Sequence, residues 1–160
     1  HRVEQLETAI EYPRVEAVDI ELAAVMQGTG SRVLEHATRH DTAVIVSSHD
    51  FEATPERETL GERLTAACEY GDVGKLAVTA TSPDDALDLL AATRAATVAG
   101  QSVATMAMGE AGRHTRVVAP VYGSRIGYAP VDPAEATAPG QYALPKLAGL
   151  VADLRGGAEL

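Results

Sequence analysis

The stretch VGKLAVTATSPDD, residues 73–85, decides the fold class of this chain. Its first part, Val73 to Thr81, is a short apolar run with branched side chains, as in a strand buried on both faces. Its second part, Ser82 to Asp85, offers a capping hydroxyl, a proline at the first helical position and two acids. A helix running to about Ala99 is therefore predicted directly after the strand. Such a pair is a βα unit, which indicates parallel strands in an α/β fold.

The same alternation extends along most of the chain. Six strands are predicted, over Val15–Leu22, Thr42–Ser48, Val73–Thr81, Ser102–Met108, Arg116–Tyr122 and Ile126–Val131. Helices are predicted over Gly30–His40, over residues 54–70 with Thr54 as N-cap and Pro55 at the first position, over Ser82–Ala99 and over Pro145–Leu154. An open doubly wound sheet and a (β/α) barrel both fit this pattern.

The length of 160 residues predicts one domain, over residues 1–160. A complete (β/α)8 barrel takes about 250 residues and eight strands. The chain also begins at His1, inside a helix-like segment. If the fold is a barrel, we expect its N-terminal part to be incomplete here and the natural protein to be longer by roughly two βα units.

The composition narrows the classes of function. The net charge of −10 argues against binding to nucleic-acid phosphates, and no apolar run is long enough for a membrane span. No glycine pattern for nucleotides follows a strand. The single cysteine is typical of a reducing cytoplasm. Two lysines against eleven arginines on an acidic chain fit either a high-salt cytoplasm or a GC-rich genome.

Lys75 is the first candidate for chemistry. It lies inside an apolar strand of a chain that almost avoids lysine. Burial disfavours an ammonium, and a lysine that becomes neutral is a nucleophile toward carbonyl groups. A lysine that reaches solvent or pairs with a carboxylate is the alternative.

Other polar residues follow the strands. His49 directly follows the run VIVSS (44–48). An imidazole at such a strand end can act as acid and base, or it can simply be a polar residue whose hydrogen bonds are satisfied. Asp19 and Glu21 share one face of a strand end and either orient a catalytic group or form a structural ion pair. In a barrel, the active site lies at these strand ends.

Arg116 suits a carboxylate ligand, with a surface arginine as the alternative. The segment Thr137–Gln141, TAPGQ, is a polar turn with hydroxyl, amide and N–H groups. His36 and His40 are spaced as metal ligands on a helix, but no third ligand is evident in the sequence, so a solvated face is favoured and no metal site is predicted.

Taken together, these segments resemble the type I 3-dehydroquinate dehydratases. The resemblance runs in order from Asp19 to Gln141. It rests on DIEL (19–22), SSHDF (47–51) with Thr54-Pro55, GKLA (74–77), MAMG (106–109), Arg116, YGS (122–124), Tyr128-Ala129 and APGQ (138–141). Each piece alone is weak, whereas the ordered series is specific.

The resemblance implies a (β/α)8 TIM barrel, here apparently lacking its first two βα units, and a hydro-lyase of the shikimate pathway that needs no cofactor. It implies that Lys75 forms an imine with 3-dehydroquinate, that His49 is the acid and base, and that Arg116, Thr137 and Gln141 bind the substrate. Tyr128 and the two methionines would be pocket-wall positions, and a homodimer is possible. Thr137 departs from the family, where serine is usual.

Two other hypotheses remain open at this stage. A class I aldolase on a similar barrel shares the imine lysine, although the Met-x-Met-Gly, Arg116 and Ala-Pro-Gly-Gln series favours the dehydratase. A non-catalytic barrel fragment or binding module is the hypothesis from a different class. The retained lysine, histidine, arginine and glutamine argue against it.

Overall fold

A computed structural model describes residues 2–156 of the chain, apart from the side chain of Pro133. Its centre is a parallel sheet in the order β1-β2-β3-β4. The strands are β1 (Ala17–Glu21), β2 (Ala43–His49), β3 (Val73–Thr79) and β4 (Val103–Met108). The predicted α/β class and the first four predicted strands are therefore confirmed.

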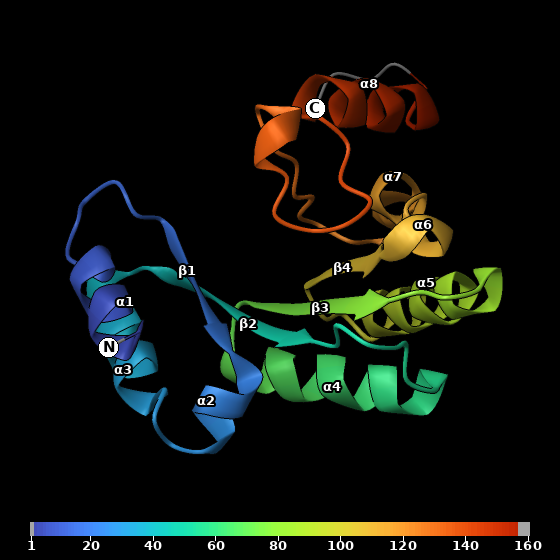
Figure 1. Cartoon of the computed structure of the whole chain (residues 1–160). Helices are drawn as coiled ribbons and strands as arrows, with labels where there is room; N and C mark the ends of the chain where they lie inside the picture. The colour runs from blue at the N-terminus through green and yellow to red at the C-terminus, as the bar shows by residue number, and fades with distance from the viewer. Residues whose placement is uncertain (1, 157–160) are drawn as a thin grey trace.

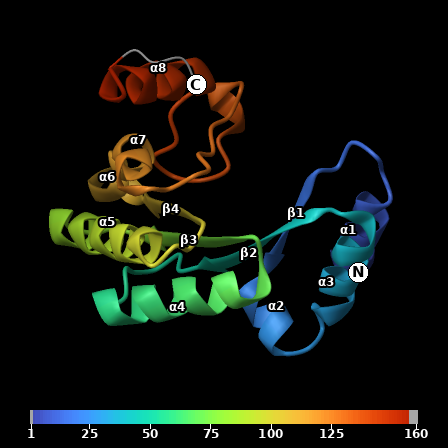
Figure 2. The ribbon, with the colours of Figure 1, turned by 180° about the vertical axis from the view of Figure 1, so that it is seen from behind.

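The helices that connect consecutive strands cover one face of the sheet. They are α3 (Ser31–His40), α4 (Arg57–Tyr70) and α5 (Pro83–Val98), with the short α2 (Leu22–Met26) after β1 (Figures 1 and 2). The helix α1 (Arg2–Ile10) packs against α3. No helix within residues 2–156 combines the length and the apolar character that crossing a membrane requires.

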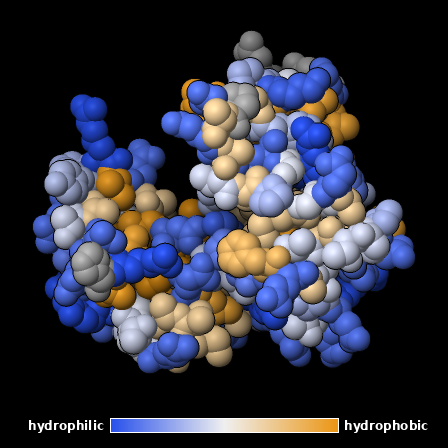
Figure 3. Space-filling model, in the orientation of Figure 1, coloured by the Kyte–Doolittle hydropathy of each residue, from blue (hydrophilic) through white to orange (hydrophobic). Residues whose placement is uncertain are grey.

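The C-terminal third of the chain lies beyond β4, away from α1 and α3 (Figure 1). It consists of α6 (Gly109–Gly112), α7 (Thr115–Val118), η1 (Ala119–Tyr122), η2 (Pro133–Glu135) and α8 (Leu144–Leu154). The space-filling view shows a recess between the α1–α3 side and the α8 side of the molecule (Figure 3). The face of the sheet without connecting helices is thus left to form a site.

The pleat of β3 separates the core from that face. Leu76 and Val78 are fully buried in one cluster with Leu64 and Leu89 of the helices. Each such side chain stabilises the fold by roughly 1.5–3 kcal/mol. Gly74 faces α4, where an added Cβ would lie 2.6 Å from the sulfur of Cys68. Since successive side chains alternate, Lys75 points to the opposite face.

Two predicted strands are wrong. Residues 116–122 form α7 and η1 instead, because Pro120 cannot donate to a sheet ladder and suits the start of a helical turn. Residues 126–131 form no strand, and they contain Gly127 and Pro130. The only pairing that the described residues add beyond β4 is a parallel bridge between Val103 and Ser124.

The helix starts divide in the same way. Ser82 accepts a hydrogen bond from the Asp85 N–H, and the Asp85 carboxylate accepts one from the Ser82 N–H, so the predicted cap is confirmed. The predicted cap at Thr54 is wrong, since α4 begins at Arg57. The Thr54 hydroxyl instead donates to the Thr79 carbonyl at 2.9 Å and ties the loop after β2 to β3.

The cap of α5 gives a stability prediction. Backbone hydrogen bonding, above all from the Thr81 N–H at 2.7 Å, lowers the pKa of Asp85. We expect Asp85→Ala to reduce the free energy of unfolding in urea by about 1 kcal/mol at pH 7. A carboxyl group whose pKa is lowered by folding stabilises the folded protein at pH values above the ordinary pKa of aspartate, and this stabilisation is lost as the pH falls. The difference in unfolding free energy between the unsubstituted protein and Asp85→Ala should therefore shrink toward pH 3.

Asp84→Ala is the matched control, because Asp84 lies in the same first turn outside the capping box and should cost only about 0.3 kcal/mol. Equal losses for the two variants would contradict the role of the box.

Candidate active site

A cavity of about 200 Å³ lies on the face of the sheet opposite the connecting helices. It is lined by all five residues to which the family resemblance gives a catalytic or substrate-binding role: His49, Lys75, Arg116, Thr137 and Gln141. They come from β2, β3, α7 and the loop before α8. The lining residues are His49, Phe51, Lys75, Ala77, Met106, Met108, Arg116, Tyr128, Thr137, Ala138 and Gln141. The fold therefore brings together residues that lie far apart in the sequence, from His49 to Gln141.

Lys75 is a largely covered cation in the wall of this cavity. Its side chain is only 11% exposed, and its Nζ donates to Asp19 Oδ2 at 2.8 Å. The same nitrogen lies 4.6 Å from the centre of the Tyr128 ring. A carboxylate and an aromatic face both stabilise an ammonium that has lost its water. The sequence had left a carboxylate pair open as an alternative, and the structure shows that pair inside the cavity wall.

Asp19 is itself held in place. Its second oxygen, Oδ1, accepts a hydrogen bond from the Ser47 hydroxyl at 2.6 Å. Ser47 is fully buried and lies next to Lys75 in the register of β2 and β3. The Asp19 carboxylate thus connects side chains of three neighbouring strands. This network holds the lysine nitrogen in place more firmly than the flexible lysine side chain could by itself.

Tyr128 completes the wall above the lysine. Burial raises the pKa of its hydroxyl, and the nearby Lys75 ammonium offsets that effect only in part. The phenol therefore stays neutral around neutral pH and contributes its ring as an apolar cover.

His49 has a carboxylate partner of its own. Its Nδ1 lies 2.7 Å from Glu21 Oε1, although the angle falls outside that of a well-aligned hydrogen bond. Its ring lies nearly parallel to that of Phe51, with centroids 5.5 Å apart. A carboxylate on Nδ1 leaves Nε2 as the nitrogen that can exchange a proton in the cavity.

Arg116 lines the cavity as a cation that has no counterion among residues 2–156. Its residue is 6% exposed, and burial lowers the pKa of the guanidinium. Nη2 donates to the Pro139 carbonyl at 3.3 Å, while the buried Nε has no hydrogen-bond partner. No carboxylate of residues 2–156 lies within 4.0 Å of it. A desolvated guanidinium with an open donor is suited to an anionic ligand.

The loop Thr137–Gln141 forms the outer wall. Gln141 Oε1 accepts hydrogen bonds from the N–H groups of Thr137 and Ala138, at 2.9 and 3.3 Å, so the amide NH₂ is left for other partners. Gly140 has φ +79°, and a Cβ there would lie 3.1 Å from the Gly109 carbonyl. Only glycine suits this position without strain, which explains the glycine in the turn.

The other histidines lie elsewhere. His36 and His40 stack with ring centroids 4.6 Å apart, and Glu11 Oε1 lies 3.8 Å from His36 Nε2. Within the described part of the chain, no group of three or more possible ligands is arranged for a metal ion. His114 is exposed and makes no cap bond at α7, and His1 lies outside the described residues.

Sequence reasoning missed part of the site. It did not identify Ser47 as a partner of Asp19, and it gave Phe51 no role in the cavity wall. The period of two along β2 was the available signal for Ser47, because it places Ser47 on the same face as His49. The pairing of Glu21 with His49 needed the register between β1 and β2, which no single strand contains.

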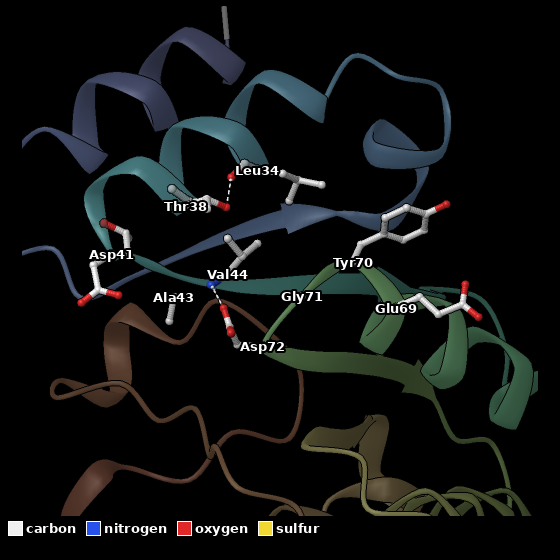
Figure 4. Close-up of a pocket in the computed structure, with 11 residues that line it drawn as sticks. Leu34, Thr38, Asp41, Ala43, Val44, Glu69, Tyr70, Gly71 and Asp72 are labelled. Carbon is white, nitrogen blue, oxygen red and sulfur yellow. Dashed lines mark hydrogen bonds between the residues drawn. The ribbon is translucent and has the colours of Figure 1, made fainter.

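A larger groove, of about 510 Å³, lies at the opposite end of the sheet, between α3 and the start of β2 and β3 (Figure 4). Its polar groups serve the backbone there: Asp72 accepts from the Val44 N–H at 2.7 Å, and Thr38 donates to the Leu34 carbonyl at 2.9 Å. Among the residues that line it, none is a lysine, histidine or cysteine. The smaller cavity is therefore the candidate active site.

Comparisons with known proteins identify the family of the chain. The sequence model of the family described as "Type I 3-dehydroquinase" matches residues 1–154. The 3-dehydroquinate dehydratase of Haloarcula marismortui is 58% identical over 158 residues, which cover 96% of this chain and 69% of that protein. A relative from this genus also fits the acidic, halophilic-like composition.

Solved structures give the same result. The 3-dehydroquinate dehydratase of Geobacillus kaustophilus superposes with a TM-score of 0.90 at 29% identity, over 99% of this chain and 61% of that one. The type I enzyme of Clostridium difficile, solved with covalent modified comenic acid, has a TM-score of 0.86 at 27% identity. It is matched over 97% of this chain, which spans 60% of its length.

The unpaired charge of Arg116 gives the next prediction. Arg116→Met removes a buried cation that has no counterion among the described residues. We expect the free energy of unfolding either to rise or, if it falls, to fall by less than about 1 kcal/mol. The reason is that replacing a buried charge by an apolar side chain is often neutral or stabilising. Thermal and urea unfolding measure this change.

Arg57→Met is the comparison variant, since Arg57 pairs with Asp88 at 2.6 Å on the surface and should cost up to about 1 kcal/mol. A loss above about 2 kcal/mol for Arg116→Met would instead make Arg116 a structural residue.

Proposed function

The chain belongs to the type I 3-dehydroquinase family, and on that premise we propose that it carries the active site of a 3-dehydroquinate dehydratase. Such a hydro-lyase removes water from 3-dehydroquinate and gives 3-dehydroshikimate in the shikimate pathway, which leads to the aromatic amino acids. One observation supports the proposal most. A single cavity is lined by a lysine and a histidine, each beside a carboxylate, and by an arginine that has no counterion among the described residues.

Lys75 is proposed to supply the covalent step. Its neutral amine adds to the substrate ketone, and loss of water from the adduct gives an imine. The Asp19 carboxylate favours the ammonium before substrate arrives, and it favours the protonated imine afterwards, because both are cations at the same place. Between these states the amine has to give up a proton, and the adjacent carboxylate and imidazole are the groups that can take it.

His49 is proposed to move the protons. A protonated imine draws electrons from the neighbouring carbon, so a C–H proton there can pass to the imidazole. The hydroxyl one carbon further on then leaves as water, with the proton that His49 returns. Glu21, whose Oε1 lies 2.7 Å from Nδ1, stabilises the imidazolium that forms in between. Hydrolysis of the imine frees the product and restores Lys75.

The remaining groups are proposed to bind the substrate. Arg116 takes the carboxylate, since it offers a desolvated fork with an open donor. Thr137 and Gln141 contribute a hydroxyl and an amide from the outer loop. Met106 and Met108 form an apolar wall that adapts to a carbon ring. This set would suit a small acid that also carries a ketone and hydroxyl groups.

We further propose that the four strands form part of a (β/α)8 barrel. The all-parallel order β1-β2-β3-β4, the site at the carboxyl ends of the strands and the family assignment support this architecture. A homodimer and a cytoplasmic location stay predictions of the sequence.

A class I aldolase stays the second candidate, because an imine lysine is common to both chemistries. Arg116 favours the dehydratase, since a buried guanidinium without counterion calls for a carboxylate on the substrate. Formation of an enone absorbance from 3-dehydroquinate distinguishes the two reactions.

Trapping tests the imine. With 3-dehydroquinate and borohydride, we expect one adduct on Lys75 in intact-mass and peptide spectra of the natural protein. Lys75→Met should give no adduct and no measurable turnover, because the nucleophile is gone. Lys146→Met is the control for the second lysine of the chain and should be trapped normally. Turnover without any adduct would refute the covalent route.

His49→Ala should lower kcat by roughly 10²- to 10⁴-fold, the usual contribution of a positioned acid and base. The imine should still form, so borohydride should trap more adduct at steady state, not less. His40→Ala serves as the control, because His40 lies on α3 outside the cavity. A His49→Ala enzyme with unchanged kcat would remove the imidazole from the mechanism.

A further inference from the structure

The loop that carries Thr137 and Gln141 has an anchor next to the cavity, not inside it. Arg113 follows α6, and its guanidinium lies 4.3 Å from the centre of the Tyr142 ring. Tyr142 is the residue directly after Gln141. A contact at this position acts on the end of the loop without touching the bound substrate.

The Tyr142 side chain has apolar neighbours as well. It packs against the small apolar cluster of Val117, Leu147 and Val151. Tyr142 also lies near enough to Arg116 to raise the pKa of that guanidinium, against the larger lowering by burial. One aromatic side chain is thus in contact with α8, with Arg113 and with the surroundings of the substrate-binding arginine.

Arg113 has few other ties. Its Nε is buried without a hydrogen-bond partner, and no carboxylate of residues 2–156 forms an ion pair with it. Its Cβ and Cγ lie 3.5 and 3.6 Å from where a Cβ on Gly140 would be, so the stem of the arginine also supports the turn of the loop. The stack on Tyr142 is therefore the main interaction of its guanidinium among the described residues.

Among the described residues, the hydrogen bonds of the loop are long or lie within the loop itself. The Arg116 bond to the Pro139 carbonyl is long, at 3.3 Å, and the bonds from Thr137 and Ala138 end on Gln141 within the loop itself. If the stack is lost, the loop loses its place over the cavity, and the hydrogen bonds that Thr137 and Ala138 donate to Gln141 open with it. Gln141 would move first, because it adjoins Tyr142.

We propose that Arg113 and Tyr142 are positioning residues that hold the Thr137–Gln141 loop against the cavity and so set the affinity for substrate. The proposal rests on the proposed function for its effect on binding, but the placement of the loop does not depend on it. Neither side chain lines the cavity. They act through Gln141 and Thr137, whose groups would otherwise be free to leave the site.

Hydrogen–deuterium exchange of the peptide spanning residues 136–141 tests the placement without any substrate. Arg113→Met and Tyr142→Leu should each speed exchange there by roughly 2- to 30-fold, the factor that corresponds to a partly buried cation–π contact. Tyr142→Phe keeps the ring and should exchange like the unsubstituted protein. Combining Arg113→Met with Tyr142→Leu should add little to either alone.

Catalysis supplies the second readout. Arg113→Met should raise KM for 3-dehydroquinate by a similar factor while kcat changes less, since the lysine and histidine are untouched. If Tyr142→Leu does not fold, Arg113→Met decides the matter. Exchange at the unsubstituted rate in Arg113→Met, or equally fast exchange in Tyr142→Phe and Tyr142→Leu, would overturn the proposal. Absence of imine trapping in the unsubstituted protein would refute the function instead and leave the exchange result standing.

Discussion

The ion pair between Lys75 and Asp19 is the interaction on which the site depends. A lysine side chain that is 11% exposed in the middle of a strand carries a costly charge unless a partner replaces the water around its ammonium. Asp19 of β1 is this partner for Lys75 of β3, and Ser47 of β2, which lies between them, donates a hydrogen bond to the Asp19 carboxylate. Three adjacent parallel strands thus share one polar network, so the position of the lysine nitrogen follows from the register of the sheet.

The fold places this network where chemistry can use it. Period-two alternation sends Leu76 and Val78 into the helical core and Lys75 to the other face. Parallel strands bring His49 to the same end of the sheet, with Glu21 behind it. The helical segment after β4 then adds Arg116, which a strand at that place would have directed differently. Cation, base and anion-binding group therefore meet at one cavity.

Much of this could be predicted from the sequence, because buried runs and caps such as Ser82 to Asp85 are local. Lys75, His49, Arg116, Thr137 and Gln141 were selected on local chemistry and family resemblance, and the structure gathers them around one cavity. The strand predicted for the segment RVVAPVY was wrong. Its branched residues suggest a strand, whereas its proline and the contacts of α7 favour helical turns. The partners of Asp19 and Glu21 could not be assigned, because they depend on register between strands.

The central claim is that the amine of Lys75 condenses with a ketone. Nitrogen-15 labelling of lysine tests it most directly, because residues 1–160 contain only Lys75 and Lys146, and Lys75→Met assigns the signals. On addition of 3-dehydroquinate, the account predicts that the Lys75 side-chain nitrogen leaves the amine region and appears as a protonated imine during turnover. Turnover with that nitrogen remaining an amine throughout would contradict the account.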